Sequence, residues 1–281
     1  MALIWGSSFL FTELSLRFLP FFGVAFWRTF LGGLAMFALV FLLKLQLPKG
    51  TQWFHLWVAG VLMSAIPFSL FSFAQQSTTS SLAAIIGAAT PIFTLLAILT
   101  IYRTEKVTIV ATLGLAVGLI GVAITLGVWE GFGQNDPLAI GALVLATISY
   151  GIGGPYIRKF VTPMNLSGTS TAAAQVFTSS ITLLPFYLFS GPLFTSSPSI
   201  ESLLAILALG VLGSGYAYRL FHDVIRDAGS TVASTVTFTN PVLATIWGIL
   251  LLGEELHWYE PIGGAVVILG AWLAQNKKTK A

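Results

Sequence analysis

The sequence predicts an all-α membrane protein with ten transmembrane helices, arranged as two five-helix repeats of inverted topology. Three observations predict it: an apolar composition, ten apolar blocks about 20 residues long, and an internal repeat. Of the 281 residues, 56% are hydrophobic and only 8% are charged, whereas a soluble domain has about 25% charged residues. The mean hydropathy is +0.90. A soluble globule of this size could not bury so many apolar side chains, whereas a lipid bilayer accommodates them.

A transmembrane α-helix needs about 20 consecutive apolar residues, and the sequence contains ten such blocks. They cover residues 2–18, 20–43, 53–74, 81–101, 107–128, 137–156, 167–189, 203–220, 230–252 and 259–274. The first block contains Glu13 and Arg17 and lacks the basic segment that opens a signal peptide. We therefore interpret it as a span. Because it begins directly at Met1, we expect a short native tail to be missing.

The distribution of Lys and Arg indicates how these spans are oriented. Of the thirteen Lys and Arg residues, eleven lie in the even-numbered loops between the spans or in the C-terminal tail. The opposite side has only Arg17, and Arg28 falls inside the second span. Loops that remain in the cytoplasm retain Lys and Arg during insertion. We therefore expect both termini to lie in the cytoplasm.

The chain repeats itself at an offset of 150 residues without gaps. Small and apolar matches are common in such a composition, so they carry little weight. The matches of Pro91 to Pro241 and of Glu105 to Glu255 at this one offset are more informative. They indicate a duplicated chain.

Each half of the chain contains five predicted spans. Because five is odd, the second half must enter the membrane from the side opposite to the first. We therefore expect a first repeat over residues 1–128 and a second repeat over residues 137–281. Inverted repeats are typical of secondary transporters, which bind their substrates near the bilayer midplane between the repeats.

Several motifs resemble those of the drug/metabolite transporter superfamily, EamA type. Residues 2–9 (ALIWGSSF) resemble its opening helix, and Arg28 in the second span fits its pattern. In each half a run of small residues is followed by Pro and then by a Glu that closes an apolar helix. One departure is residues 103–105 (RTE), where the family usually has a Gly-Glu pair.

This resemblance covers the whole chain as two EamA-like halves. It implies ten spans, cytoplasmic termini and export of small metabolites across the bacterial inner membrane. Among the branches of the superfamily, the chain looks most similar to the bacterial exporters of amino acids, including aromatic amino acids.

Two prolines predict a substrate site near the middle of the membrane. Pro91 and Pro241 each lie near the centre of a span, where proline frees the carbonyl four residues earlier. Thr90 and Asn240 stand beside them at equivalent positions of the two halves. Helix kinks that serve only packing are the alternative. The symmetric placement of the pair favours substrate binding.

Trp5 and Tyr150 form a second pair of candidates. Each is followed by a glycine and lies in the first helix of its half. Their rings could stack on an aromatic or cationic substrate. Helix packing, or anchoring of Trp5 at the membrane interface, is the alternative.

Ionisable residues within spans are costly and attract functional interpretations. Glu13 and Arg17 are spaced to pair on one helix face, and we treat them, with Arg28, as candidates for gating or charge pairing. Arg28 could bind a substrate carboxylate through two hydrogen bonds. It could equally bind backbone carbonyls or Glu13. Gln175 occupies a comparable place in the seventh span.

Two loops related by the repeat are candidate gates. Residues 75–79 form a short outer loop, and residues 222–229 form its charged cytoplasmic counterpart. Solvated turns are the alternative for both. Tyr216 and Tyr218 are weaker candidates for the site, and an aromatic belt would explain them equally well.

The sequence contains few of the residue patterns that enzymes use for catalysis. It has no cysteine, and its three histidines lack metal-ligand spacing. A P-loop and a nucleophile elbow are also missing. We therefore expect no catalytic residue, no cofactor, no metal site and no nucleic-acid partner.

The sequence thus predicts a secondary transporter or facilitator that exports small amphipathic metabolites, most of all amino acids, by alternating access. Its partners would be a small-molecule substrate and the lipid bilayer. Export of drugs or quaternary ammonium compounds is the alternative within transport, and an intramembrane enzyme is the alternative of another class. The energy source and the oligomeric state stay open, a monomer being one option.

Overall fold

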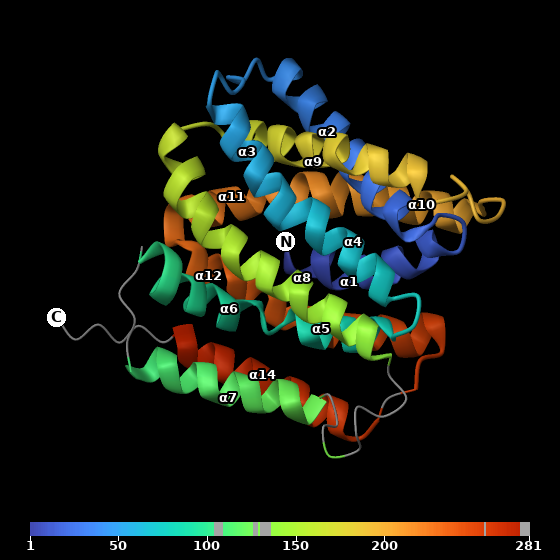
Figure 1. The fold of residues 1–281 in the computed structure, drawn as a ribbon, viewed down its shortest axis with the longest axis vertical. Coiled ribbons are helices and arrows are strands. Elements are labelled where there is room, and N and C mark those ends of the chain that lie inside the picture. Colours follow the sequence, from blue (N-terminus) through green and yellow to red (C-terminus); the bar gives the residue numbers. More distant parts are fainter. Residues whose placement is uncertain (104–108, 126–128, 130–135, 256, 276–281) are drawn as a thin grey trace.

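The structure is a computed structural model that describes residues 1–281 except 104–108, 126–128, 130–135, 256 and 276–281. Its helices run alongside one another in a single bundle (Figure 1). Among the described residues, seven helical segments are long and apolar enough to cross a membrane. They cover Phe21–Leu42, Gln52–Ala74, Ser80–Tyr102, Pro137–Met164, Gly168–Phe189, Ile200–Ala228 and Ser230–Leu252. Three shorter apolar helices, α1 (Ala2–Leu16), α7 (Ile109–Thr125) and α14 (Tyr259–Gln275), complete the ten predicted spans.

Most of the long segments are interrupted, so they carry several helix labels. In the first half the remaining elements are α2 (Phe21–Leu42), α3 (Gln52–Gly60), η1 (Val61–Ala65), α4 (Ile66–Ala74), α5 (Ser80–Gly87), α6 (Thr90–Ala97) and η2 (Ile98–Tyr102). In the second half they are α8 (Pro137–Tyr156), η4 (Ile157–Val161), η5 (Thr162–Met164), α9 (Gly168–Phe189), α10 (Ile200–Ala208), η6 (Leu209–Tyr216), α11 (Ala217–Ala228), α12 (Ser230–Ser234), η7 (Thr235–Thr239), α13 (Asn240–Trp247) and η8 (Gly248–Leu252).

The packing pairs each half with the other. α2 packs on α9 and η6, while α1 packs on α13 and α10. In the same way α8, the first helix of the second half, packs on α4 and α6 of the first half. α7 and α14 lie side by side along one edge of the bundle (Figure 1). The fold is therefore two interlocked halves rather than two separate domains.

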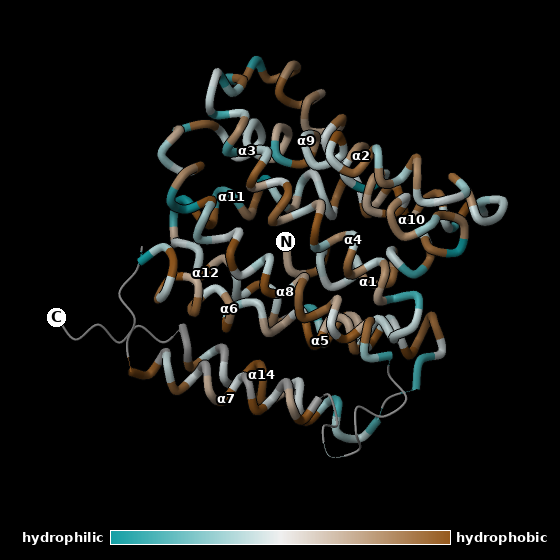
Figure 2. Tube along the Cα trace, viewed as in Figure 1, coloured by the Kyte–Doolittle hydropathy of each residue, from teal (hydrophilic) through white to brown (hydrophobic). Residues whose placement is uncertain are grey.

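Apolar side chains also cover the outside of the bundle. Leu42, Phe189, Ile109 and Ile200 are each more than three-quarters exposed. Figure 2 shows hydrophobic residues along the lengths of the helices and hydrophilic residues gathered toward the loops. Lipid chains are the solvent that such a surface requires, so the structure describes an all-α multi-pass membrane protein, as predicted.

Local structure recurs at the offset of 150 residues. The π-helical turns η2 and η8 begin 150 residues apart, and each is followed by a residue in the left-handed conformation, Arg103 (φ 49°) and Gly253 (φ 68°). The π-helical turns η1 and η6 also overlap at this offset. Extra residues in a helical turn change which side chains face the bundle interior. Glu105 and the C-terminal tail lie outside the described residues.

Two predicted boundaries were wrong. The helix that contains block 203–220 continues to Ala228, so residues 222–229, predicted as a charged loop, are mostly helical. Block 137–156 likewise extends through η4 and η5 to Met164. A search for apolar residues stops at the first charges, whereas an amphipathic helix continues past them.

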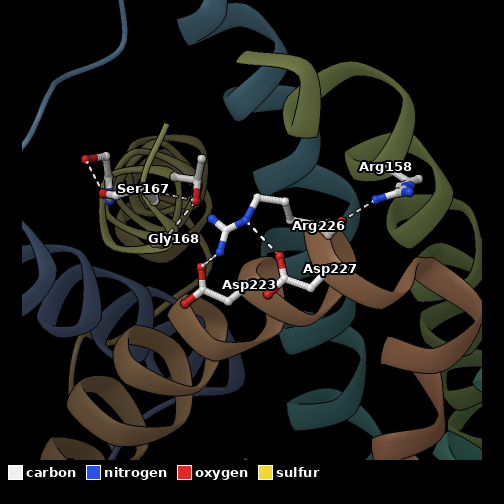
Figure 3. Close-up of polar contacts among 8 residues, drawn as sticks. Arg158, Ser167, Gly168, Asp223, Arg226 and Asp227 are labelled. Atoms are coloured by element: carbon white, nitrogen blue, oxygen red, sulfur yellow. Dashed lines mark hydrogen bonds and ion pairs between the residues drawn. The ribbon is translucent and has the colours of Figure 1, made fainter. Parts of the chain in front are cut away.

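The charged end of α11 illustrates the reason. Arg226 Nη2 lies 2.8 Å from Asp223 Oδ1, and its Nε lies 3.1 Å from Asp227 Oδ1. Arg158 Nη1 donates to the carbonyls of Ile225 and Arg226, at 2.8 and 2.6 Å (Figure 3). An arginine that binds the last carbonyls of a helix stabilises its C-terminus. The charges therefore complete this helix rather than end it.

Candidate functional site

A cavity lies in the centre of the bundle between the two halves. Its empty volume is about 770 Å³, open mouth included. The first half contributes side chains from α1, α2, η1, α4, α5 and α6, together with Gln75. The second half contributes side chains from α8, α11, α12, η7 and α13. Ligand sites are mostly apolar with a few polar groups, and the lining of this cavity has that composition.

The structure brings together five of the nine residues predicted for the site. Trp5, Arg28, Thr90, Tyr150 and Asn240 all line the cavity. The other four, named next, do not belong to its described lining.

Pro91 and Pro241 lie beside the cavity at breaks in their helices. Pro91 falls in the first turn of α6, after α5 ends at Gly87, and Thr90 Oγ1 donates to the Gly87 carbonyl at 2.6 Å. In the second half, the backbone N–H of Asn240 donates to the carbonyl of Thr237. Both carbonyls that the prolines free therefore already have protein donors. Side chains, rather than these carbonyls, supply the polar groups.

Glu13 and Arg17 are absent from the described lining of the cavity, to which α1 contributes Trp5, Ser8, Phe9 and Thr12. Arg17 is exposed beyond the end of α1. Within the described part of the chain, no ion pair joins Glu13 to Arg17 or to Arg28.

Aromatic side chains form two walls that are related by the repeat. Trp5 packs on Phe221, with ring centroids 5.3 Å apart. Tyr150 packs on Phe71, with centroids 6.0 Å apart. Phe71 and Phe221 are separated by 150 residues, so each first helix places its aromatic ring against the equivalent ring of the other half. The sequence identified Trp5 and Tyr150 but missed their partners.

Tyr218 extends the wall beside Trp5. Its ring centroid lies 5.5 Å from that of Trp5, and its hydroxyl donates to the carbonyl of Met63. From the sequence alone Tyr218 is a weaker candidate for the site, because it lies close to the predicted end of a span. Since α11 continues beyond it, Tyr218 lies inside the bundle, and only 1% of the residue is exposed.

Three polar atoms of the lining are buried and have no hydrogen-bond partner among the described residues. They are Gln75 Oε1, Thr94 Oγ1 and Asn240 Oδ1. Most buried polar atoms in proteins have a partner, so these atoms mark where a ligand or water would bind. Gln75 also donates from Nε2 to the Phe9 carbonyl at 3.0 Å. The sequence placed Gln75 in an outer loop and gave Thr94 no role, because helix rotation decides which side chains face inward.

Arg28 is the charged side chain of the described lining. It is 5% exposed, and its Nε donates to Ser214 Oγ at 3.0 Å. Its guanidinium carbon lies 3.5 Å from the centre of the Phe68 ring. A cation on a helix at the bilayer centre costs about 2.5–3.5 kcal/mol on insertion scales, so its placement in a cavity indicates a function.

A hydrogen bond equivalent to that between Arg28 and Ser214 joins α9 of the second half to η1 of the first half. Gln175 Nε2 donates to Ser64 Oγ at 3.4 Å, and its Oε1 accepts from His222 Nε2 at 2.8 Å. Ser64 and Ser214 are separated by 150 residues. Thus α2 of the first half bonds to the second half, and α9 of the second half bonds to the first. Each half therefore forms an equivalent hydrogen bond to the other.

Glu254 connects the halves at one end of the bundle. Its Oε1 accepts from the N–H of Ser80 at 2.7 Å, and its Oε2 accepts from the Ser81 hydroxyl, also at 2.7 Å. A carboxylate at a helix N-terminus satisfies unpaired N–H groups and complements the helix dipole. The sequence showed Glu254 only as the end of an apolar helix, because the partner helix lies in the other half.

The geometry of the bundle and its cavity defines a class of protein. An apolar helical bundle whose two related halves surround a central cavity has the architecture of a membrane transporter. The sequence model of the EamA-like transporter family matches residues 1–127 and 137–275. The chain therefore belongs to the EamA-like transporter family, and it is a secondary transporter rather than a member of an enzyme family.

Relatives of similar length support this assignment. The "Uncharacterized inner membrane transporter YedA" of Escherichia coli (strain K12) is 26% identical over 273 residues, covering 96% of this chain and 87% of that protein. An "Uncharacterized transporter" of Archaeoglobus fulgidus is 26% identical, with 98% and 95% covered. A solved crystal structure shares the fold, with a TM-score of 0.72 at 18% identity over 97% of each chain.

Proposed function

We propose that this protein exports small amphipathic metabolites, above all amino acids and including aromatic ones, across the bacterial inner membrane. The observation that carries the proposal is the central cavity, which both halves line with aromatic walls and a small set of polar groups. Aromatic faces suit an apolar side chain, and the polar groups suit a hydrophilic head. Equivalent residues from the two halves would let one site open alternately to either side.

The proposal includes an orientation. Both termini would lie in the cytoplasm, as the distribution of Lys and Arg indicates, and residues 1–128 and 137–281 would act as the two repeats. Arg158, Arg219 and Arg226 then lie toward the cytoplasmic end. The E. coli relative, named an inner membrane transporter, supports the bacterial inner membrane.

Export of drugs or quaternary ammonium compounds is the second candidate. The aromatic walls support it, since aromatic faces attract cations. Arg28 argues against it, because a buried positive charge in the lining repels a cation. Amino acids therefore remain the favoured substrates.

Facilitated transport fits the cavity better than proton exchange. Asp, Glu and His are absent from the described lining, so it offers no group that would bind and release a proton near neutral pH. We therefore propose movement of substrate down its own gradient.

Purified protein in proteoliposomes tests both parts of this proposal. Uptake of radiolabelled phenylalanine and other amino acids is compared with uptake of a labelled quaternary ammonium compound, with and without an imposed pH gradient. We expect amino-acid uptake that stops at equilibrium and exceeds that of protein-free liposomes. Uptake of the ammonium compound alone would favour the second candidate, and accumulation that follows the pH gradient would refute facilitation.

A further inference from the structure

Arg28 is a buried cation without a counterion in the described structure. No Asp or Glu side chain lies within ion-pair distance of its guanidinium among the described residues, and the hydrogen bond to Ser214 uses only Nε. Arginine has five N–H donors, so the remaining donors of a residue that lines the cavity are available to a ligand.

The second half of the protein provides an internal comparison. At the equivalent place Gln175 forms the same link to Ser64 with a neutral amide, and it is completely buried. The crossed hydrogen bond between the halves therefore does not require a positive charge. Neither the hydrogen bond to Ser214 nor the stacking on Phe68 supplies an anion to balance the charge of Arg28.

We propose that Arg28 binds the carboxylate of the substrate and that the cavity selects compact organic monocarboxylates with an apolar or aromatic body. This inference rests on the proposed function, because it assigns a substrate class to the same cavity. The planar guanidinium matches a carboxylate through paired, charge-assisted hydrogen bonds. A bound carboxylate would also neutralise the one charge of the described lining.

The same arrangement of polar groups implies that a substrate does not need an amino group in order to bind. Two acceptors of the lining without a partner among the described residues, Gln75 Oε1 and Asn240 Oδ1, are neutral amide oxygens. They can accept hydrogen bonds from an ammonium group but cannot cancel its charge. An amine without a carboxylate would add a second positive charge beside Arg28, which a low-dielectric site disfavours.

Three ligands with the same phenyl body separate these requirements: phenylalanine, 3-phenylpropanoate and 2-phenylethylamine. Binding of each to the purified full-length protein is measured by isothermal titration. We expect both carboxylates to bind and the amine to bind at least about tenfold more weakly. Equal or tighter binding of the amine would overturn the proposal, and this result needs no variant.

Variants then identify the residue. Arg28→Gln copies the residue at the equivalent position of the second half, so it should fold, and thermal unfolding checks this. It should weaken both carboxylates by about tenfold or more and remove the preference over the amine, while Arg28→Lys should restore part of the affinity. Arg17→Gln, at an exposed arginine, is the matched control and should change nothing. Unchanged carboxylate binding in folded Arg28→Gln would refute the role of Arg28.

The outcome for the proposed function is separate. If liposomes transport no amino acid but 3-phenylpropanoate still binds through Arg28, amino-acid export is wrong and the monocarboxylate site stands. If amino acids are transported equally well by Arg28→Gln, export stands and the carboxylate role of Arg28 is wrong.

Discussion

Trp5 contributes both a ring and a hydrogen bond to the cavity, and substitutions can separate the two. Its Nε1 donates to the Gly213 carbonyl at 2.9 Å, while its ring contacts Phe221. Trp5→Phe keeps an aromatic face and loses the hydrogen bond, whereas Trp5→Ala loses both. If the ring binds substrate, Trp5→Ala should lower transport of aromatic amino acids by about 2–10-fold, and Trp5→Phe should retain most of it.

Transport in proteoliposomes and thermal unfolding of the same preparations check this. Tyr150→Ala should behave like Trp5→Ala because the two rings occupy equivalent walls. If both alanine variants fail to fold, the rings serve packing instead.

Substitution of Asn240 is expected to affect the stability of the protein and its binding of substrate in opposite directions. The Oδ1 atom of Asn240 is buried and has no hydrogen-bond partner in the part of the chain that the structure describes. An unpaired buried acceptor lowers stability, whereas a hydrogen bond contributes about 0.5–1.5 kcal/mol. Asn240→Ala should therefore leave the thermal stability of the empty protein equal or higher, while it raises the half-saturation concentration about 2–10-fold. Lower stability with unchanged half-saturation would make Asn240 a structural residue.

Some residues that line the cavity can be recognised in the sequence by their residue type, and others cannot. Arg28 stood out because a charge inside an apolar block is rare, and Trp5 and Tyr150 stood out as matched aromatic–glycine pairs. Gln75 and Thr94 look like ordinary loop and helix residues in the sequence. Their roles depend on the rotation of their helices, which the packing of the whole bundle sets.

At the scale of helices, close contact between α2 and η6 depends on glycine. A Cβ atom added to Gly32 would lie 2.6 Å from the Gly210 carbonyl oxygen, which belongs to the backbone and cannot move aside. Gly32→Ala should therefore separate the two halves locally and cost about 1–3 kcal/mol. Gly141→Ala is the matched control, since a Cβ there would meet no atom within 4 Å.

Thermal unfolding in detergent measures both variants. We expect a lower midpoint for Gly32→Ala, and an unchanged or slightly higher midpoint for Gly141→Ala because alanine favours helix. Equal midpoints would show that α2 and η6 are not held this closely.

The contact of Glu254 allows a prediction about access to the cavity from the end of the bundle where this contact lies. Its carboxylate joins the segment that follows η8 to the N-terminus of α5 through Ser80 and Ser81. Glu254→Gln keeps the size but removes the charge, which weakens bonds worth about 1.5–3 kcal/mol each with a charged partner. A cysteine placed at Thr12, in the lining, should then react faster with a thiol reagent from this end. Glu255→Gln, at an exposed neighbour, should leave the rate unchanged.

The chain has no native cysteine, so the labelling rate reports this one position. A rate in Glu254→Gln equal to that of the parent would show that the contact does not hold this end closed.

At the scale of the whole molecule, much of the fold could be predicted from the sequence. Long apolar blocks predict transmembrane helices, because backbone N–H and C=O groups must be hydrogen-bonded within the chain when lipid surrounds it. The fixed offset of 150 residues indicates the duplication. The helical continuation to Ala228 cannot be predicted from apolar residues alone, because its last two turns are charged and amphipathic. Contacts across the halves, such as Glu254 with Ser80, are invisible in the sequence because the partners are 174 residues apart.

Alternating access to the central cavity is the central claim, and cysteine accessibility tests it most directly. Thr94 lines the cavity and is 1% exposed. A Thr94→Cys protein is treated with a membrane-impermeant thiol reagent, once in intact cells and once in inside-out vesicles, with and without phenylalanine. We predict labelling from both sides and slower labelling when substrate is present. Labelling from one side only, or at a rate that substrate does not change, would contradict it.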